Sequence, residues 1–170
     1  KSLAYAHSPA ALADAGLREQ LRNSVIQCFE FTYELSWKML KRHLMTDHGL
    51  SPDGKTLYIS QEDDAALGFF DIASGKFTRT VEVGKEPEGV KASPDGKLVW
   101  VTSAVANMVH VVDPATGKVI KNLKVGKRPR RLALTPDGSQ LWVTNEMSAN
   151  ISIISTKDWS VIDTVKFEVK

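Results

Sequence analysis

Several residue types that would point to a class of function are scarce in this sequence. Only one of its 170 residues is cysteine, Cys28, so an internal disulfide framework is excluded. No apolar run approaches the ~18 residues that a membrane-spanning helix needs, and the first residues lack the apolar core of a secretory signal. Lys and Arg (22) nearly balance Asp and Glu (20), and the net charge of +2 gives no general reason to expect nucleic acid. We expect neither a membrane nor a nucleic-acid partner, and the compartment stays undetermined.

Residues for catalysis or metal binding are equally sparse. The four histidines lie in unrelated contexts, and none pairs with Cys, Asp or Glu at metal-ligand spacing. Asp63-Asp64 lacks the alternating oxygen ligands and the glycine of a calcium loop. We find no Gly-rich phosphate loop, Ser/His/Asp set or Cys/His pair, although two carboxylates from distant loops stay an alternative. We therefore expect no catalytic residue, no metal, no cofactor and no enzyme activity, and we expect Cys28 to be a buried thiol.

The sequence does contain an internal repeat. The tetrapeptide Ser/Thr-Pro-Asp-Gly occurs at 51–54, 93–96 and 135–138, which are 42 residues apart both times. Pro sets φ at the second turn position, Asp bonds its own backbone, and Gly supplies a positive φ. Ala73-Ser-Gly75 and Ala115-Thr-Gly117 predict a second turn, which Trp159 should reshape because it replaces the glycine.

Each repeat contains runs rich in Val, Ile and aromatic residues between these turns. Four short strands in about 40 residues are typical of a β-propeller blade. The segment Leu98-Val-Trp-Val101 is apolar on both faces, as a sheet stacked between two neighbours requires. We expect Trp100 and Trp142 to pack between blades, and the first copy to lack its innermost strand because 44–48 do not match the other copies.

The repeats resemble a known family. Leu57-Tyr-Ile-Ser, Val99-Trp-Val-Thr and Leu141-Trp-Val-Thr-Asn145 are similar to the defining strand of YVTN-type β-propeller repeats. The further segments Glu86-Pro-Glu-Gly-Val and Arg128-Pro-Arg resemble exported propeller proteins associated with PQQ-dependent alcohol catabolism. This resemblance implies a propeller of about seven blades, of which 47–170 supply three.

Residues 1–46 have a different pattern. Apolar residues recur at spacings of three and four on two roughly opposite sides of a predicted helix, which is typical of a helix inside a bundle. One side contains Phe29, Tyr33 and Trp37, and the other contains Phe31 and Met39. We expect these five residues to form packing or interface contacts, against an open blade or against the same helix of another copy.

The helical segment also resembles a family. The stretch from Leu21 to Lys41, with Ile26-Gln-Cys-Phe-Glu-Phe-Thr-Tyr-Glu-Leu-Ser-Trp-Lys38, is similar to nucleotidyltransferase substrate-binding proteins. These are helical bundles that pair with a minimal nucleotidyltransferase, and their shared acidic positions correspond to Glu30 and Glu34. Because the two parts of the chain resemble unrelated families, the whole is interpreted as a chimera.

The loops that enter successive repeats are the candidate ligand site. The second has Glu-Pro-Glu where the third has Arg-Pro-Arg-Arg, so ion pairing between the loops competes with binding of an anion. Asn145 lies at the end of a strand nearby, where turn chemistry competes with ligand binding. The candidate residues are Glu86, Glu88, Arg128, Arg130, Arg131 and Asn145.

Taken together, the sequence predicts a mainly β fold with an N-terminal α segment. About three four-stranded blades of a partial propeller (47–170) follow a helical hairpin or one long helix (1–46). The favoured function is a non-enzymatic repeat scaffold whose property is folding and assembly. A binding module of a PQQ-linked pathway and an accessory partner of a nucleotidyltransferase are the alternatives. Three blades leave open faces, so we expect a homo-oligomer, with a further protein partner as an option.

Overall fold

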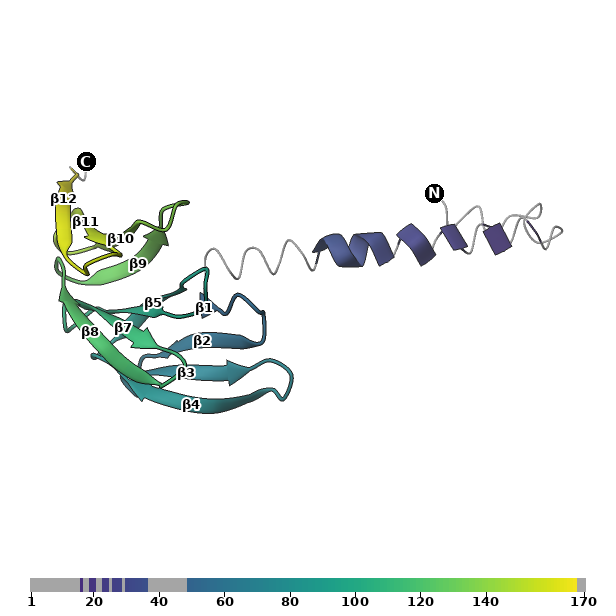
Figure 1. Cartoon of the computed structure of the whole chain (residues 1–170), viewed down its shortest axis with the longest axis horizontal. Helices are drawn as coiled ribbons and strands as arrows, with labels where there is room; N and C mark the ends of the chain where they lie inside the picture. The colour runs from purple at the N-terminus through teal and green to yellow at the C-terminus, as the bar shows by residue number, and fades with distance from the viewer. Residues whose placement is uncertain are drawn as a thin grey trace. The chain divides into compact units, whose positions relative to one another are not determined.

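The structure, a computed structural model, describes residues 49–167 and, nearer the N-terminus, residues 16, 19–20, 23–24, 26–28 and 30–36. The chain divides into two compact units, Lys1–Arg42 and His43–Lys170, and each is described by itself. In the second unit the described strands form three four-stranded sheets, with β1, β5 and β9 on the inner side and β4, β8 and β12 on the outer side (Figure 1). The predicted mainly β fold of three blades with an α segment is confirmed.

The strands of the second unit are β1 (Gly49–Leu50), β2 (Thr56–Gln61), β3 (Ala66–Asp71), β4 (Lys76–Glu82), β5 (Pro87–Ala92), β6 (Val99–Ser103), β7 (Met108–Asp113), β8 (Lys118–Lys124), β9 (Pro129–Leu134), β10 (Gln140–Asn145), β11 (Asn150–Ser155) and β12 (Val161–Lys166).

Each sheet is an antiparallel meander with the same register. A bulge interrupts the pairing of the two outer strands at equivalent places: Phe69/Phe70, Val111/Val112 and Ile153/Ile154. The first sheet does have an innermost strand, contrary to expectation, because Gly49 and Leu50 pair with Tyr58 and Leu57. Residues 44–48, on which that expectation rested, lie outside the described residues.

The Ser/Thr-Pro-Asp-Gly turns stabilise the link between the first two strands of each sheet. In the second turn, the Ser93 hydroxyl donates to Asp95 (2.7 Å) and accepts from the Leu98 N–H (2.9 Å). Gly96 has a φ of 72° and donates its N–H to the Ser93 carbonyl (3.0 Å). In the third turn, the Thr135 and Ser139 hydroxyls lower the pKa of Asp137 to about 2. The repeated motif therefore fixes the backbone conformation of the turn.

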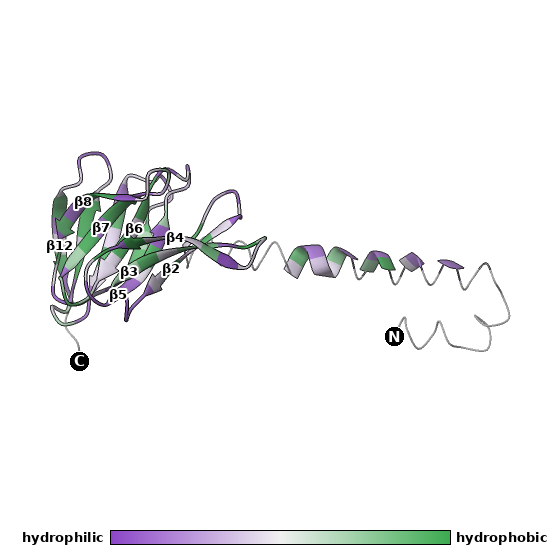
Figure 2. Ribbon diagram, turned by 90° about the horizontal axis from the view of Figure 1, so that it is seen from below, coloured by the Kyte–Doolittle hydropathy of each residue, from purple (hydrophilic) through white to green (hydrophobic). Residues whose placement is uncertain are grey.

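The hydrophobic core lies in two layers between the sheets, and Figure 2 shows hydrophobic residues along the strands that form it. β6 of the middle sheet is buried along its whole length, which confirms that this sheet is covered on both faces. The layer between the first and second sheets consists of Tyr58, Leu67, Phe69, Val81, Ala92, Val99, Val101 and Val112. The layer between the second and third sheets consists of Trp100, Val109, Val111, Leu123, Leu141, Val143 and Ile154.

Two tryptophans depart from expectation. Trp100 is 2% exposed, but its equivalent Trp142 is 38% exposed, because no described sheet covers that face of the third sheet. Trp159 keeps the turn conformation of the glycines that it replaces, with a φ of 58° and an N–H bond to the Ser155 carbonyl (3.1 Å). β12 begins one residue later in its repeat than β4 and β8 do. The indole of Trp159 lies 6.1 Å from that of Trp100, and this contact stabilises the unfavourable backbone.

The described residues of the first unit are all helical and all exposed. Cys28 is exposed, so the predicted buried thiol is wrong, because no described residue of this unit covers the helix there. Phe31 and Tyr33 are 69% and 66% exposed. Phe29, Trp37 and Met39 lie outside the described residues, so the predicted packing role of this set stays a prediction. No helix among the described residues is long and apolar enough to cross a bilayer.

Gly138 offers a test of the turn, because it has a φ of 72° and a Cβ added there would meet no atom within 4 Å. Gly138→Ala should lower the free energy of unfolding by about 1–2 kcal/mol through backbone strain alone. Gly138→Asn should lower it less, since Asn tolerates the left-handed conformation. Urea unfolding checks both, and an unchanged midpoint for Gly138→Ala would contradict the assigned turn.

Candidate functional site

The candidate site lies where β5 and β9 begin and β10 ends. Glu86 and Arg128 precede the prolines that open β5 and β9, and both have positive φ (52° and 55°). Their carbonyls accept the N–H groups of Ala104 (2.8 Å) and Glu146 (3.0 Å). The two entry loops therefore share one backbone geometry and are fixed to the turns that follow β6 and β10.

One residue of the preceding sheet positions the third entry loop. The side-chain oxygen of Asn107, in the turn after β6, accepts the Arg128 N–H at 2.9 Å. Asn107 has a φ of 57°, which an Asn tolerates better than most residues. This bond connects the second sheet to the loop that opens the third, so turn chemistry explains Asn107.

Opposite charges from the two loops meet. Arg130 Nη1 lies 2.7 Å from Glu88 Oε1 and 3.6 Å from Glu146 Oε2. Arg128 Nε lies 3.3 Å from the same Glu146 oxygen, within ion-pair distance but without hydrogen-bond geometry. The ion pairing that the sequence suggested between the loops is present. Because the side chains are partly exposed, it contributes about 0–1 kcal/mol per pair.

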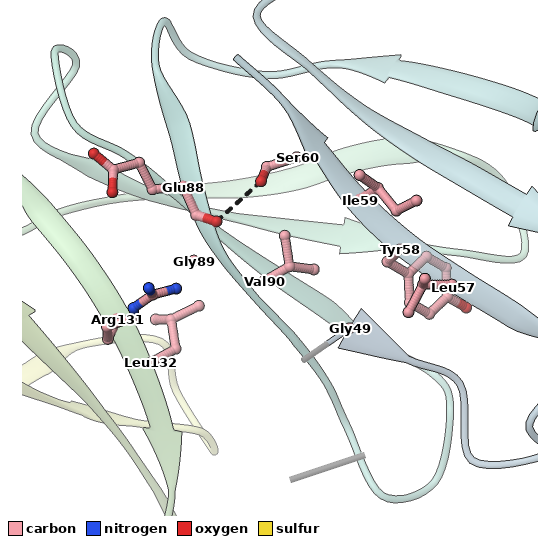
Figure 3. A pocket seen from close by; sticks show the side chains of 10 residues that line it. All are labelled: Gly49, Leu57, Tyr58, Ile59, Ser60, Glu88, Gly89, Val90, Arg131 and Leu132. Atoms are coloured by element: carbon pink, nitrogen blue, oxygen red, sulfur yellow. Dashed lines mark hydrogen bonds between the residues drawn. The ribbon is translucent and has the colours of Figure 1, made fainter. Parts of the chain in front are cut away.

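Arg131 differs from its neighbours, since its guanidinium forms no ion pair with any carboxylate in the described part of the chain. It lines a cavity of about 410 Å³ at the inner strands (Figure 3). Apolar side chains of β2 line one side of this cavity, and those of β5 and β9 line the other. The Ser60 hydroxyl donates to the Glu88 carbonyl (3.0 Å) across this cavity. Its lining residues are Gly49, Leu57, Tyr58, Ile59, Ser60, Glu88, Gly89, Val90, Arg131 and Leu132.

A second cavity of about 340 Å³ adjoins the first through Ser60, Glu88 and Arg131. Glu62, Pro87, Arg128 and Arg130 complete its lining. The loops therefore bring five of the six candidate residues to one end of the sheets, with Glu86 at a neighbouring hollow beside Arg128. Whether any of them binds a ligand stays a prediction.

The side chain of Asn145 forms no ion pair or hydrogen bond with this charged group. Its side chain is fully buried, and its amide donates to Asn150 (2.8 Å) and to the Ser152 hydroxyl (2.9 Å). An added Cβ on Gly126 would lie 2.6 Å from it, so the glycine is needed for this contact. Asn145 lines none of the cavities above, and its bonds are those of a structural residue of the third sheet.

Two residues of this end of the sheets were not singled out from the sequence. Glu146 forms ion pairs with both loop arginines, but it lies in a turn whose equivalents are Ala104 and Glu62, so no repeat signal marks it. His110 is buried and accepts the Gly84 N–H at Nε2 (3.0 Å). Its Nδ1–H must then donate to Asn122 Oδ1 (2.7 Å), which defines a neutral ring. No three His, Cys, Asp or Glu residues within the described ranges gather closely enough to hold a metal.

The comparisons with known proteins find different relatives for the N-terminal part of the chain and for the three sheets. The fold defines the class: three consecutive blades of a β-propeller-like protein. A solved hydrazine synthase of Kuenenia stuttgartiensis is similar over 73% of this chain, with 31% identity and a TM-score of 0.68. A solved dihydro-heme d1 dehydrogenase NirN, in complex with DHE, is similar in fold over 68%, with 23% identity and a TM-score of 0.59. The chain spans 36% and 25% of those two chains.

A different family matches the N-terminal part. The sequence model of proteins described as "nucleotidyltransferase substrate binding protein like" matches residues 5–56. The match includes the described helical residues and extends through β1 to the first residue of β2. No curated protein matches the chain.

The neutral state of His110 predicts a pH dependence. Burial lowers the pKa of this ring below 6.5, although the bond to Asn122 partly offsets the effect. Below pH 6.5 the unfolded chain takes up a proton that the folded chain resists, so stability should fall as the pH drops towards the lowered pKa. Chemical unfolding of the parent and of His110→Gln at pH 7.5 and 5.5 checks this. An equal loss in both proteins would show that His110 does not carry the effect.

Proposed function

We propose that this chain is a non-enzymatic propeller-repeat scaffold whose role is assembly with further blades. The observation that carries the proposal is the contrast between the sheets. The middle sheet is buried on both faces, whereas the outer sheets leave apolar residues such as Trp142 (38% exposed) and Phe77 (49% exposed) without a described sheet over them. Large apolar side chains exposed in this way mark an interaction site.

The charged loops support a structural role over catalysis. A catalytic acid or base needs a pKa matched to its task and a free route to the substrate. Glu88 and Glu146 instead face Arg130, and Arg128 also lies beside Glu146. We infer that the blades are of the YVTN type and that they form a binding module of the PQQ-linked kind, in which Arg131 of the two adjoining cavities would contact the ligand. We also infer a chimera, since the family match to 5–56 and the propeller similarity have unrelated sources.

Light scattering of the full chain tests the assembly. We expect a mass of at least twice 18.7 kDa at micromolar concentrations, because an exposed face of several large apolar side chains is costly in water. A monodisperse 18.7 kDa species at high concentration would contradict the proposal. Reproducible hydrolase, dehydrogenase or nucleotidyl-transfer turnover that Arg130→Gln abolishes would contradict its non-enzymatic part.

A second candidate function is that of an accessory protein to a nucleotidyltransferase. The family match to 5–56 favours it, as do the exposed Phe31, Tyr33 and Leu35 on the described helix. Calorimetric titration with a purified minimal nucleotidyltransferase tests it. Phe31→Ala should weaken binding by at least fivefold, about 1 kcal/mol, as a large apolar contact does. Ser24→Ala is the control, and absence of binding by the parent chain would remove this candidate.

A further inference from the structure

The two internal layers of the core use one recurring pair of surfaces. Here the forward face means the side of a sheet that packs on the next sheet in the chain, and the reverse face means the side that packs on the preceding one. Tyr58, Leu67, Phe69 and Val81 of the first sheet occupy the same repeat positions as Trp100, Val109, Val111 and Leu123 of the second, 42 residues on. Val99, Val101 and Val112 of the second sheet likewise match Leu141, Val143 and Ile154 of the third. Every internal junction is therefore a forward face on a reverse face.

The third sheet presents a forward face that no described sheet covers. Adding 42 to the forward positions gives Trp142, Ile151, Ile153 and Val165, all apolar. Trp142 and Val165 are 38% and 42% exposed, whereas their equivalents Trp100 and Leu123 are 2% and 5% exposed. Thr144 is exposed too, although the equivalent hydroxyls of Ser60 and Thr102 donate to carbonyls of the next sheet at 3.0 and 3.3 Å. This surface therefore has the residue types of a forward face at an internal junction, but no described sheet packs on it.

The first sheet presents the complementary reverse face. The positions equivalent to Val99, Val101 and Val112 are Leu57, Ile59 and Phe70, again apolar. Phe77 lies beside them, with its ring 5.4 Å from that of Phe70, and is 49% exposed. Gly75 of the first sheet is equivalent to Trp159 of the third sheet. The indole of Trp159 contacts Trp100 at the junction of the second and third sheets, and the first sheet has no side chain at that position. The reverse face can therefore accept an indole as large as that of Trp142.

We propose that a second copy of this chain is the partner of both faces. The forward face of the third sheet in each copy packs on the reverse face of the first sheet in the other, and the two junctions close a ring. This proposal rests on the assembly role given under the proposed function. It goes further, because it names the partner, the two surfaces and the number of copies.

The number of copies follows from the repeat. A junction between two different surfaces either closes into a ring or extends into a filament. Propellers close with about four to eight blades, and six is the only multiple of three in that range. Two copies of these three blades therefore make a ring of six blades.

The test combines single variants with a mixture. The parent chain of 170 residues and its Trp142→Glu and Phe77→Glu variants are compared by sedimentation velocity over a range of concentrations. Each substitution places a carboxylate in one of the two faces. The dissociation constant of the dimer should therefore be at least 100-fold higher for each variant than for the parent. Ile120→Glu is the matched control, because Ile120 is 51% exposed but lies on the middle sheet, whose two faces are both covered.

Mixing the two variants distinguishes this junction from a symmetric one. The Trp142→Glu chain keeps its reverse face and the Phe77→Glu chain keeps its forward face, so the mixture should form a heterodimer that neither variant forms alone. That rescue would also show that both variants are folded. A dimer that survives Phe77→Glu, or a mixture that stays monomeric, overturns the proposed junction but leaves assembly standing. An assembly that grows with concentration overturns the closed ring alone, and a monomeric parent overturns both proposals.

Discussion

The structure depends on one constraint: a sheet that is apolar on both faces must be covered on both. In the middle sheet this condition is met, and β6 is buried from Val99 to Ser103. Each large side chain buried there contributes roughly 1.5–3 kcal/mol, which makes the two core layers the main source of stability in this unit. The bulges, the entry loops and the turns serve this stacking, because they place equivalent residues at equivalent heights in consecutive sheets.

The turns show how local chemistry sets the register on which the stacking depends. A shift of one residue in a strand would exchange its two faces. In a sheet that is apolar on both sides the hydrophobic pattern alone penalises such a shift only weakly. The Ser93 hydroxyl donates to Asp95 and accepts the Leu98 N–H. These bonds fix the hairpin between β5 and β6 independently of the core. The same bonds recur at Thr135, so the register is specified in each repeat by a few polar atoms outside the core.

Most local features of the fold could be predicted from the sequence, and so could the pairing of the two charged entry loops, but other non-local features could not. A period of 42 residues, the turn tetrapeptides and the doubly apolar strands suffice for three blades. The same repeat suggested that Trp100 and Trp142 are equivalent, yet their exposure differs because it depends on what lies beyond the sheet, not on the strand. Glu146 illustrates the limit at the candidate site. Its pairing with Arg128 and Arg130 arises from loops that approach only after the sheets stack, and neither spacing nor periodicity encodes that approach.

The charges of the entry loops help to specify which sheets pack together, because the hydrophobic core alone specifies this order only weakly. All junctions use similar aliphatic and aromatic positions, so apolar contact alone would tolerate several orders of the blades. The pair Glu88–Arg130 joins the start of β5 to the start of β9 and exists only when a Glu-Pro-Glu loop precedes an Arg-Pro-Arg loop. Its contribution to stability is small at its exposure, but two entry loops of the same charge placed side by side would repel. The entry loops thus select the neighbour that the hydrophobic faces then bind.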